Sequence, residues 1–133
     1  MGHSGDRLAA SFGVTRREQD EFAMRSHKLA HEATKNGYLS DIVPVNVSNR
    51  SEPVSHDLGI RVSTMEQMAK LKPAFIKEFG TVTAANASYL TDGASACLIM
   101  TEEKAKQLGL KPKAYLRNWV YVAQDPKDQL LLG

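Results

Sequence analysis

The segment from residue 80 to residue 88 constrains the fold of this chain more than any other part of it. Its sequence, GTVTAANAS, consists mainly of small and polar residues and contains no aromatic residue. A buried strand usually carries bulky β-branched side chains, and a surface loop usually carries long solvated ones. Small side chains instead let the backbone come close to a neighbouring group. The segment therefore predicts the wall of a narrow ligand tunnel, on which Asn86 and Ser88 provide hydrogen-bonding groups.

The residues after this segment predict a β-α-β unit. A turn at residues 91–93 (TDG) leads into an apolar run at residues 94–100, which has the composition of a buried strand. A helix is predicted over residues 101–108 and a second strand over residues 114–122. Two strands cannot close a sheet, and the apolar residues 130–132 would be left uncovered. The pattern therefore indicates an incomplete domain.

Capping patterns locate the helices. Thr15 with Glu18, and Thr64 with Gln67, match the capping box, in which each side chain bonds the backbone N–H of the other residue. Thr101 is a suitable N-cap for a third helix. The predicted helices cover residues 16–36, ending at Gly37; a short stretch from residue 64 that ends before Pro73; residues 101–108, ending at Gly109; and residues 6–12.

The helix over residues 16–36 has one apolar face, which we expect to pack inward. At about 100° per residue, that face holds Phe22, Ala23, Ser26, Leu29, Ala30 and Ala33. His27 and His31 are spaced as i and i+4 but lie off this face. A zinc-protease pattern would need glutamate where the chain has Lys28, and no third ligand is evident. We therefore expect two surface histidines and no metal site.

The segment after this helix predicts a strand and a loop. Residues 42–47 alternate apolar and polar positions, which indicates a strand, and Pro44 places that strand at a sheet edge because proline cannot donate a backbone hydrogen bond. Residues 48–59 (SNRSEPVSHDLG) are polar and rich in turn-forming residues, and they predict a surface loop.

Composition restricts the class of protein. A chain of 133 residues that is 42% hydrophobic suits one domain with a core, and a net charge of +2 is far from that of a nucleic-acid binder. The single cysteine, Cys97, excludes an internal disulfide, and we expect it to be a small buried hydrophobe within its apolar run. No apolar run reaches the roughly 20 residues of a membrane-spanning helix. The N-terminus lacks the pattern of a targeting segment.

Three sequence blocks occur in order: KLKPAF at residues 70–75, GTVTAANAS at residues 80–88 and DGASA at residues 92–96. In order and spacing they resemble the thiolase family, and the resemblance extends over essentially the whole chain. It implies an α/β fold of the thiolase type, present here as an α+β fragment. Residues 1–92 would form the mainly helical loop domain, which binds CoA. Residues 93–133 would form the start of the C-terminal half, with its β-α-β unit incomplete.

The resemblance assigns CoA-binding roles to five residues. Met1 would line the tunnel for the pantetheine arm of CoA, and Phe75 would pack against the ligand. Ala84 and Ser88 would let the pantetheine amides approach, through small size and a hydroxyl group, and Arg61 would lie near the adenine nucleotide. No catalytic residue is assigned to this chain. The nucleophilic cysteine, the catalytic histidine and the second cysteine of a thiolase are expected outside these 133 residues, so the chain is expected to be inactive alone.

The activity that the resemblance implies is thiolytic cleavage of a 3-ketoacyl-CoA in fatty acid β-oxidation. CoA and acyl-CoA are then substrates of an acyltransferase, and no cofactor is needed. Tyr89, where many thiolases have glycine, and Thr91, where they have asparagine, indicate a branch that works in a mitochondrial trifunctional complex. A mitochondrial location is therefore implied. The implied partners are the remainder of a thiolase chain, further copies in a homo-oligomer, and the α subunit of that complex.

Simpler interpretations stand beside these. Taken singly, Phe75 is most often a core residue, Arg61 a solvated charge, and Asn86 and Ser88 turn or cap residues. At the level of function, a non-catalytic CoA-binding or assembly module is the alternative to part of an enzyme. A small nucleic-acid binder is the weakest hypothesis, because basic and aromatic residues do not interleave along any face.

Overall fold

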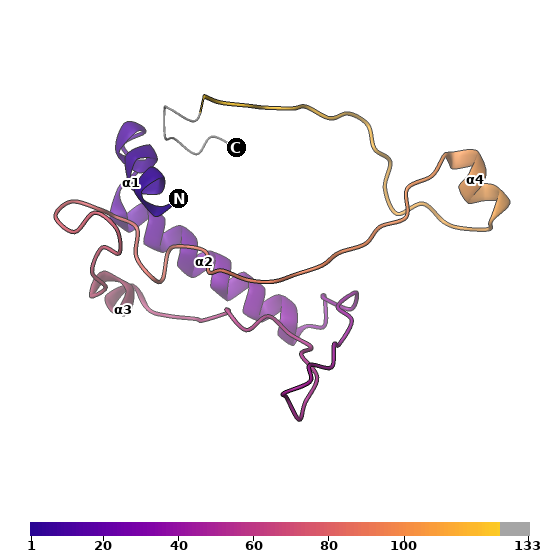
Figure 1. The fold of residues 1–133 in the computed structure, drawn as a ribbon, viewed down its shortest axis with the longest axis horizontal. Helices are drawn as coiled ribbons and strands as arrows, with labels where there is room; N and C mark the ends of the chain where they lie inside the picture. Colours follow the sequence, from indigo (N-terminus) through magenta and orange to yellow (C-terminus); the bar gives the residue numbers. More distant parts are fainter. Residues whose placement is uncertain (126–133) are drawn as a thin grey trace. The chain divides into compact units, whose positions relative to one another are not determined.

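The computed structural model describes residues 1–125, and these residues contain four helices and no strand (Figure 1). The predicted α/β character is therefore not seen in the described part of the chain. The helices are α1 (Gly2–Ser11), α2 (Arg16–Lys35), α3 (Met65–Ala69) and α4 (Glu102–Gln107). None of them combines the length and the apolarity that a bilayer crossing requires. The apolar residues 130–132, for which an uncovered end is predicted, lie outside the described residues.

The described residues form two compact units, one covering Met1–Tyr89 and the other beginning at Leu90. The first unit holds α1, α2 and α3 together with the small-residue segment 80–88. The second unit holds α4. Because every residue predicted to bind a ligand falls between Met1 and Tyr89, the first unit is the one that matters for the site.

Helix α1 begins at Gly2, earlier than the start predicted at residue 6. The prediction was wrong because glycine is a poor helix former, and both Gly2 and Gly5 lie in this first turn. A tertiary contact compensates for the propensity. The ring of Phe75 occupies the space where a side chain on residue 2 would begin, so any larger residue at this position would have to displace that ring.

Helix α2 begins and ends as its caps predict. The Thr15 hydroxyl oxygen accepts the Glu18 N–H at 3.3 Å, and the Glu18 carboxylate accepts the Thr15 N–H at 2.8 Å, which confirms the capping box. Beyond the last helical residue, Lys35, Gly37 has a φ of 70°. This left-handed conformation carries no steric penalty for glycine and ends the helix.

The buried face of α2 is rotated from the predicted one and overlaps it only in part. Phe22 is 71% exposed and Leu29 is 48% exposed, whereas Asp20 is only 2% exposed. The small residues of the predicted face, Ala23, Ala30 and Ala33, are half-buried, but its two large apolar side chains stay exposed. The helix instead turns a stripe containing Arg16, Asp20 and His27 toward the rest of the first unit, because those polar side chains have fixed partners there.

Helix α3 is short and lies beside α2 (Figure 1). Its predicted capping box is confirmed: Gln67 N–H donates to the Thr64 hydroxyl at 3.3 Å, and Thr64 N–H donates to the Gln67 side chain at 2.9 Å. The helix ends at Ala69, before Pro73, as expected. Met68 is 2% exposed and is the largest fully buried apolar side chain among the described residues.

The predicted edge strand at residues 42–47 is reduced to one antiparallel bridge. Val45 and Val54 exchange two backbone hydrogen bonds, of 3.0 and 2.9 Å, and the pairing extends no further. These bonds close the polar segment 48–53 into a loop. A strand needs backbone partners along its length, and Pro44 interrupts donation next to the bridge.

In the second unit only the helix prediction is confirmed. Lys104 N–H donates to the Thr101 hydroxyl at 3.2 Å, α4 follows, and Gly109 takes a φ of 67° after it. The strands predicted at residues 94–100 and 114–122 do not form. Strands are stable only when a neighbouring segment pairs with their backbone, and the described residues provide none here. For the same reason the prediction that Cys97 is buried is wrong, since this thiol is exposed.

Candidate functional site

The carboxylate of Asp6 fixes the start of the small-residue segment. Its Oδ1 accepts the Thr81 N–H at 2.7 Å and the Val82 N–H at 2.9 Å, and its Oδ2 lies 3.3 Å from the Ile76 nitrogen. Burial raises the pKa of Asp6, but these three N–H groups stabilise the anion, and the net effect is a pKa below the ordinary value of 3.8. Asp6 thereby ties α1 to the backbone of the segment.

Gly80 is required for this approach. A Cβ atom at position 80 would lie 2.8 Å from the Asp6 Oδ2 and still closer to the Ile76 carbonyl oxygen. The Gly80 N–H also donates to that carbonyl at 2.8 Å, closing a turn. The glycine at the start of the segment is therefore explained by close backbone contact, as the sequence predicts.

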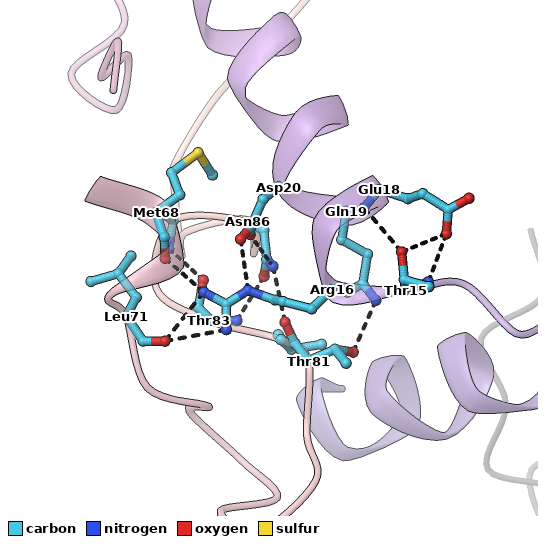
Figure 2. Close-up of polar contacts among 12 residues, drawn as sticks. Thr15, Arg16, Glu18, Gln19, Asp20, Met68, Leu71, Thr81, Thr83 and Asn86 are labelled. Atoms are coloured by element: carbon cyan, nitrogen blue, oxygen red, sulfur yellow. Dashed lines mark hydrogen bonds and ion pairs between the residues drawn. The ribbon is translucent and has the colours of Figure 1, made fainter. Parts of the chain in front are cut away.

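A second anchor joins α2 to the segment through Asp20. Asp20 Oδ2 accepts from Arg16 Nε at 2.8 Å, and Asp20 Oδ1 accepts from Asn86 Nδ2 at 2.9 Å, as Figure 2 shows. The Arg16 guanidinium then donates to the carbonyl of Met68 at 2.7 Å and to that of Leu71 at 3.2 Å. One buried ion pair thus holds the end of α3 and the small-residue segment against the same helix.

The amide of Asn86 folds residues 83–86 into a turn. Its Oδ1 accepts the Thr83 N–H at 2.6 Å, and its Nδ2 donates to the Thr81 carbonyl at 3.0 Å. The Thr83 side chain is fully buried, and its hydroxyl accepts the Ala85 N–H at 3.2 Å. Because every one of these groups is satisfied internally, the turn is held rigidly with Ala84 at its outer edge.

A cavity of about 80 Å³ opens between α2, α3 and the turn. It combines one cation, several hydrogen-bonding groups and small or apolar side chains, from His27, Arg61, Ser63, Met68, Leu71, Ala84, Ala85 and Tyr89. Whole small-molecule sites usually measure about 300 to 1,000 Å³. A cavity of this size has room for only one part of such a small molecule.

The structure brings two of the five predicted site residues together in this cavity. Arg61 and Ala84 both line it. Ser88 does not, and its hydroxyl donates to the carbonyl of the adjacent Tyr89 at 3.2 Å. Ser88 is therefore outside the cavity lining but bonded to the neighbouring residue Tyr89, which belongs to that lining.

The remaining two predicted residues are found near the first turn of α1: one precedes it and the other packs against it. Met1 is 91% exposed and precedes the first turn. Phe75 packs on Gly2 and meets the ring of His3 edge to face, with ring centroids 5.9 Å apart. Neither Met1 nor Phe75 lines the cavity.

His27 was missed by the sequence analysis, and its assignment as a surface residue is wrong. It is half-buried, it lines the cavity, and its Nδ1 accepts the Arg61 N–H at 3.1 Å. His31, by contrast, is exposed as expected. The spacing of Arg16, Asp20 and His27 would have indicated a shared polar face, had polar rather than apolar periodicity been followed.

Tyr89 is a second residue that sequence reasoning did not place in the site. Its ring lies against Gly59, where an added Cβ would come within 2.9 Å of it. Tyr89 thereby closes one side of the cavity near Arg61. The sequence signal that could have indicated this is an aromatic residue directly after the segment of small residues.

A larger cavity of about 170 Å³ lies near the end of α2. It is lined by Thr34, Gly37, Leu39, Ser40, Ile42, Ser55, His56 and Asp57. Its lining has a carboxylate and no lysine or arginine, so it suits an anionic ligand less well than the cavity beside Arg61 does.

The model of the thiolase N-terminal domain matches residues 1–103 of this chain. A probable 3-ketoacyl-CoA thiolase of Caenorhabditis elegans is 69% identical over 134 residues, covering all of this chain and 30% of the relative. The mitochondrial trifunctional enzyme subunit beta of Homo sapiens is 68% identical over 133 residues, covering all of this chain and 28% of the relative. The chain thus spans less than a third of the length of these relatives.

Solved structures agree with the sequence matches. The acetyl-CoA acetyltransferase of Bacillus anthracis superposes with a TM-score of 0.76 at 47% identity, over 84% of this chain and 29% of that structure. The dimeric peroxisomal thiolase of Saccharomyces cerevisiae gives a TM-score of 0.57 at 34% identity, over 64% of this chain and 22% of that structure.

Proposed function

Because this chain belongs to the thiolase family, we propose that it supplies one wall of the CoA-binding site of a thiolase. The observation that carries this proposal is the cavity in which Arg61 and Ala84 meet. These two residues are 23 positions apart in sequence and were assigned to the same ligand from motif position alone. The Asp6 and Asp20 anchors give that wall a fixed shape.

The chemistry of the cavity suits CoA. Pantetheine is a thin arm with amide groups, which needs little width and a few hydrogen bonds, and Ala84 and Ala85 leave room for it. The nucleotide end of CoA carries phosphates, for which an arginine is the preferred partner. We propose that Arg61 binds that end, and that Met1, Phe75 and Ser88 contact the ligand where it extends beyond the cavity.

The proposed reaction is thiolytic cleavage of a 3-ketoacyl-CoA in fatty acid β-oxidation. A cysteine thiolate attacks the 3-carbonyl carbon, the bond between C2 and C3 breaks, acetyl-CoA leaves with a proton, and a second CoA thiol accepts the acyl group from the cysteine. In this proposal the chain binds CoA and supplies no nucleophile. Cys97 lies outside the unit that holds the cavity, and we assign it no catalytic role.

The domain organisation of the chain is also a proposal. We propose a loop domain over residues 1–92 and the start of the C-terminal half over residues 93–133. The change of compact unit at Tyr89 supports a boundary close to residue 92. The names of the relatives support a mitochondrial location, association with the α subunit of a trifunctional enzyme, and assembly with further copies.

Calorimetric titration of CoA into the purified 133-residue chain tests the proposal. Arg61→Ala should weaken CoA binding about tenfold, at about 1.4 kcal/mol per tenfold, because a charged hydrogen bond is lost. Arg50→Ala is the matched control, since Arg50 is exposed and lies outside the cavity. Absence of CoA binding by the unmodified chain, or an equal loss in both variants, would contradict the proposal.

Ala84→Leu tests the cavity itself. The added isopropyl group would occupy much of a space of about 80 Å³, so binding should fall by more than in Arg61→Ala. Ala10→Leu is the control, because Ala10 is exposed on α1 and leucine is a good helix former. Unchanged affinity in Ala84→Leu would place the CoA site elsewhere.

A further inference from the structure

We propose that His27 is a specificity-determining residue of this cavity, with a separate task for each ring nitrogen. Nδ1 holds the backbone of Arg61, and the Nε2–H donates a hydrogen bond to an acceptor on the nucleotide portion of CoA. The inference rests on the proposed CoA function and adds to it a residue that motif position does not assign.

The hydrogen bond to Arg61 determines the tautomer of His27. The Arg61 N–H is a donor, so the Nδ1 that accepts it at 3.1 Å carries no proton. A neutral imidazole has one N–H, which must then be on Nε2. The backbone of Arg61 therefore makes the other ring nitrogen a hydrogen-bond donor.

The position of the ring makes that donor available to a ligand. His27 lines the cavity together with Arg61, Ser63 and Tyr89. Among the described residues, His27 Nε2 has no hydrogen-bond partner. The side chains of Asp20 and Arg16, two and three turns earlier on α2, are both paired. An unpaired donor on a half-buried residue that lines a cavity gains free energy when a ligand acceptor pairs with it.

The nucleotide portion is the part of CoA that His27 should contact. Its ring is bonded to the backbone of Arg61, and Arg61 is the cation proposed for the phosphates. Phosphate oxygens and adenine ring nitrogens are both acceptors for an N–H donor. The pantetheine amides are proposed to approach the side of the cavity that Ala84 and Ala85 form.

Two substitutions separate the tasks of the ring nitrogens. In His27→Asn, the side-chain oxygen is as many bonds from Cα as Nδ1 is, so it can accept the Arg61 N–H, but the donor at the Nε2 position is lost. In His27→Gln, the terminal NH₂ lies as many bonds from Cα as Nε2 does, so a donor to the ligand is kept. His31→Gln is the matched control, because His31 is exposed one turn further along α2.

The first measurement needs no ligand. Long-range proton–nitrogen correlation spectra of the chain labelled with ¹⁵N-histidine should show His27 as the Nε2–H tautomer. A proton on Nδ1 would overturn the inference whatever the chain binds.

The second measurement is a titration of the same labelled chain with three probes: CoA, adenosine 3′,5′-bisphosphate and pantetheine. The His27 Nε2 resonance should shift with the first two probes and not with the third. A response to pantetheine alone, or no His27 response while the Ala84 and Ala85 amides shift with CoA, would overturn the inference and leave the CoA site in place. If no resonance shifts with CoA, the proposed function fails and the inference fails with it.

The third measurement compares affinities for CoA. His27→Asn should weaken binding about 2- to 12-fold, equivalent to about 0.5 to 1.5 kcal/mol for one hydrogen bond, while His27→Gln should recover most of that loss. A purely structural role would give the reverse order, because only the asparagine preserves the bond to Arg61. His31→Gln should bind CoA as the unmodified chain does.

Discussion

Replacement of Asp6 by alanine should be the most destabilising single change in the first unit. It removes the acceptor for two short backbone bonds, of 2.7 Å from Thr81 and 2.9 Å from Val82, and for a longer one of 3.3 Å from Ile76. A hydrogen bond to a charged group contributes about 1.5 to 3 kcal/mol. We count only the two short bonds. We take the lower half of that range for each, because Thr81 and Val82 are partly exposed to water. The free energy of unfolding should then fall by about 3 to 4 kcal/mol.

Asp6→Asn separates charge from geometry. The asparagine oxygen can still accept from Thr81 and Val82, but neutral hydrogen bonds are roughly half as strong as charge-assisted ones. We therefore expect a loss of about 1.5 to 2 kcal/mol, half of that in Asp6→Ala. Asp41→Ala is the control, since Asp41 is exposed, and it should change stability by less than about 0.5 kcal/mol.

Two measurements check these expectations. Urea unfolding followed by far-UV circular dichroism gives the free energy of unfolding, and amide hydrogen exchange reports on Thr81 and Val82 directly. In Asp6→Ala these two amides should exchange much faster, while the amides in the centre of α2 change less. If Asp6→Ala unfolds at the same urea concentration as Asp41→Ala, or if both amides keep their protection, the assigned role of the carboxylate is wrong.

Three further predictions concern the same unit. Because the pKa of Asp6 is lowered in the folded state, its carboxylate stabilises the fold fully above the ordinary pKa of 3.8, and this stabilisation is lost as the pH falls through the lower folded-state pKa. The stability of Asp6→Asn should lack this dependence on pH. Asn86→Ala removes the donor to Asp20 Oδ1 and the acceptor of the Thr83 N–H, and should cost about 2 to 4 kcal/mol in urea unfolding, whereas Asn36→Ala at an exposed position should cost far less. Thr15→Ala removes the N-cap of α2 and should lower stability by about 1 kcal/mol, with Thr15→Ser close to the unmodified chain; an unchanged melting temperature in Thr15→Ala would contradict the capping role.

The two segments of the second unit that are predicted as strands expose large apolar side chains. Leu98, Ile99, Val120 and Tyr121 are largely exposed, and they lie in the two segments predicted as strands. Their composition predicts strands, but a strand forms only against another backbone. The apolar character of these segments is thus consistent with the predicted strands even though the described residues do not form a sheet.

The sequence alone determined the features that depend on neighbouring residues. The starts of α2, α3 and α4 follow from the side chains of Thr15, Thr64 and Thr101, because a capping bond spans only three residues. The small residues around Ala84 were predicted to line a ligand wall, and Ala84 lines the cavity with Arg61.

Only the tertiary structure decided which side of α2 faces inward. Apolar periodicity favoured the face of Phe22 and Leu29. The inward face is instead rotated toward Arg16 and Asp20, because these residues bind the Met68 carbonyl and Asn86, which are 52 and 66 residues away in the sequence. That rotation carries His27 into the cavity. The spacing of Arg16, Asp20 and His27 shows that they share one face of the helix. It does not show that this face turns inward, because the partners that decide the orientation lie far away in the sequence.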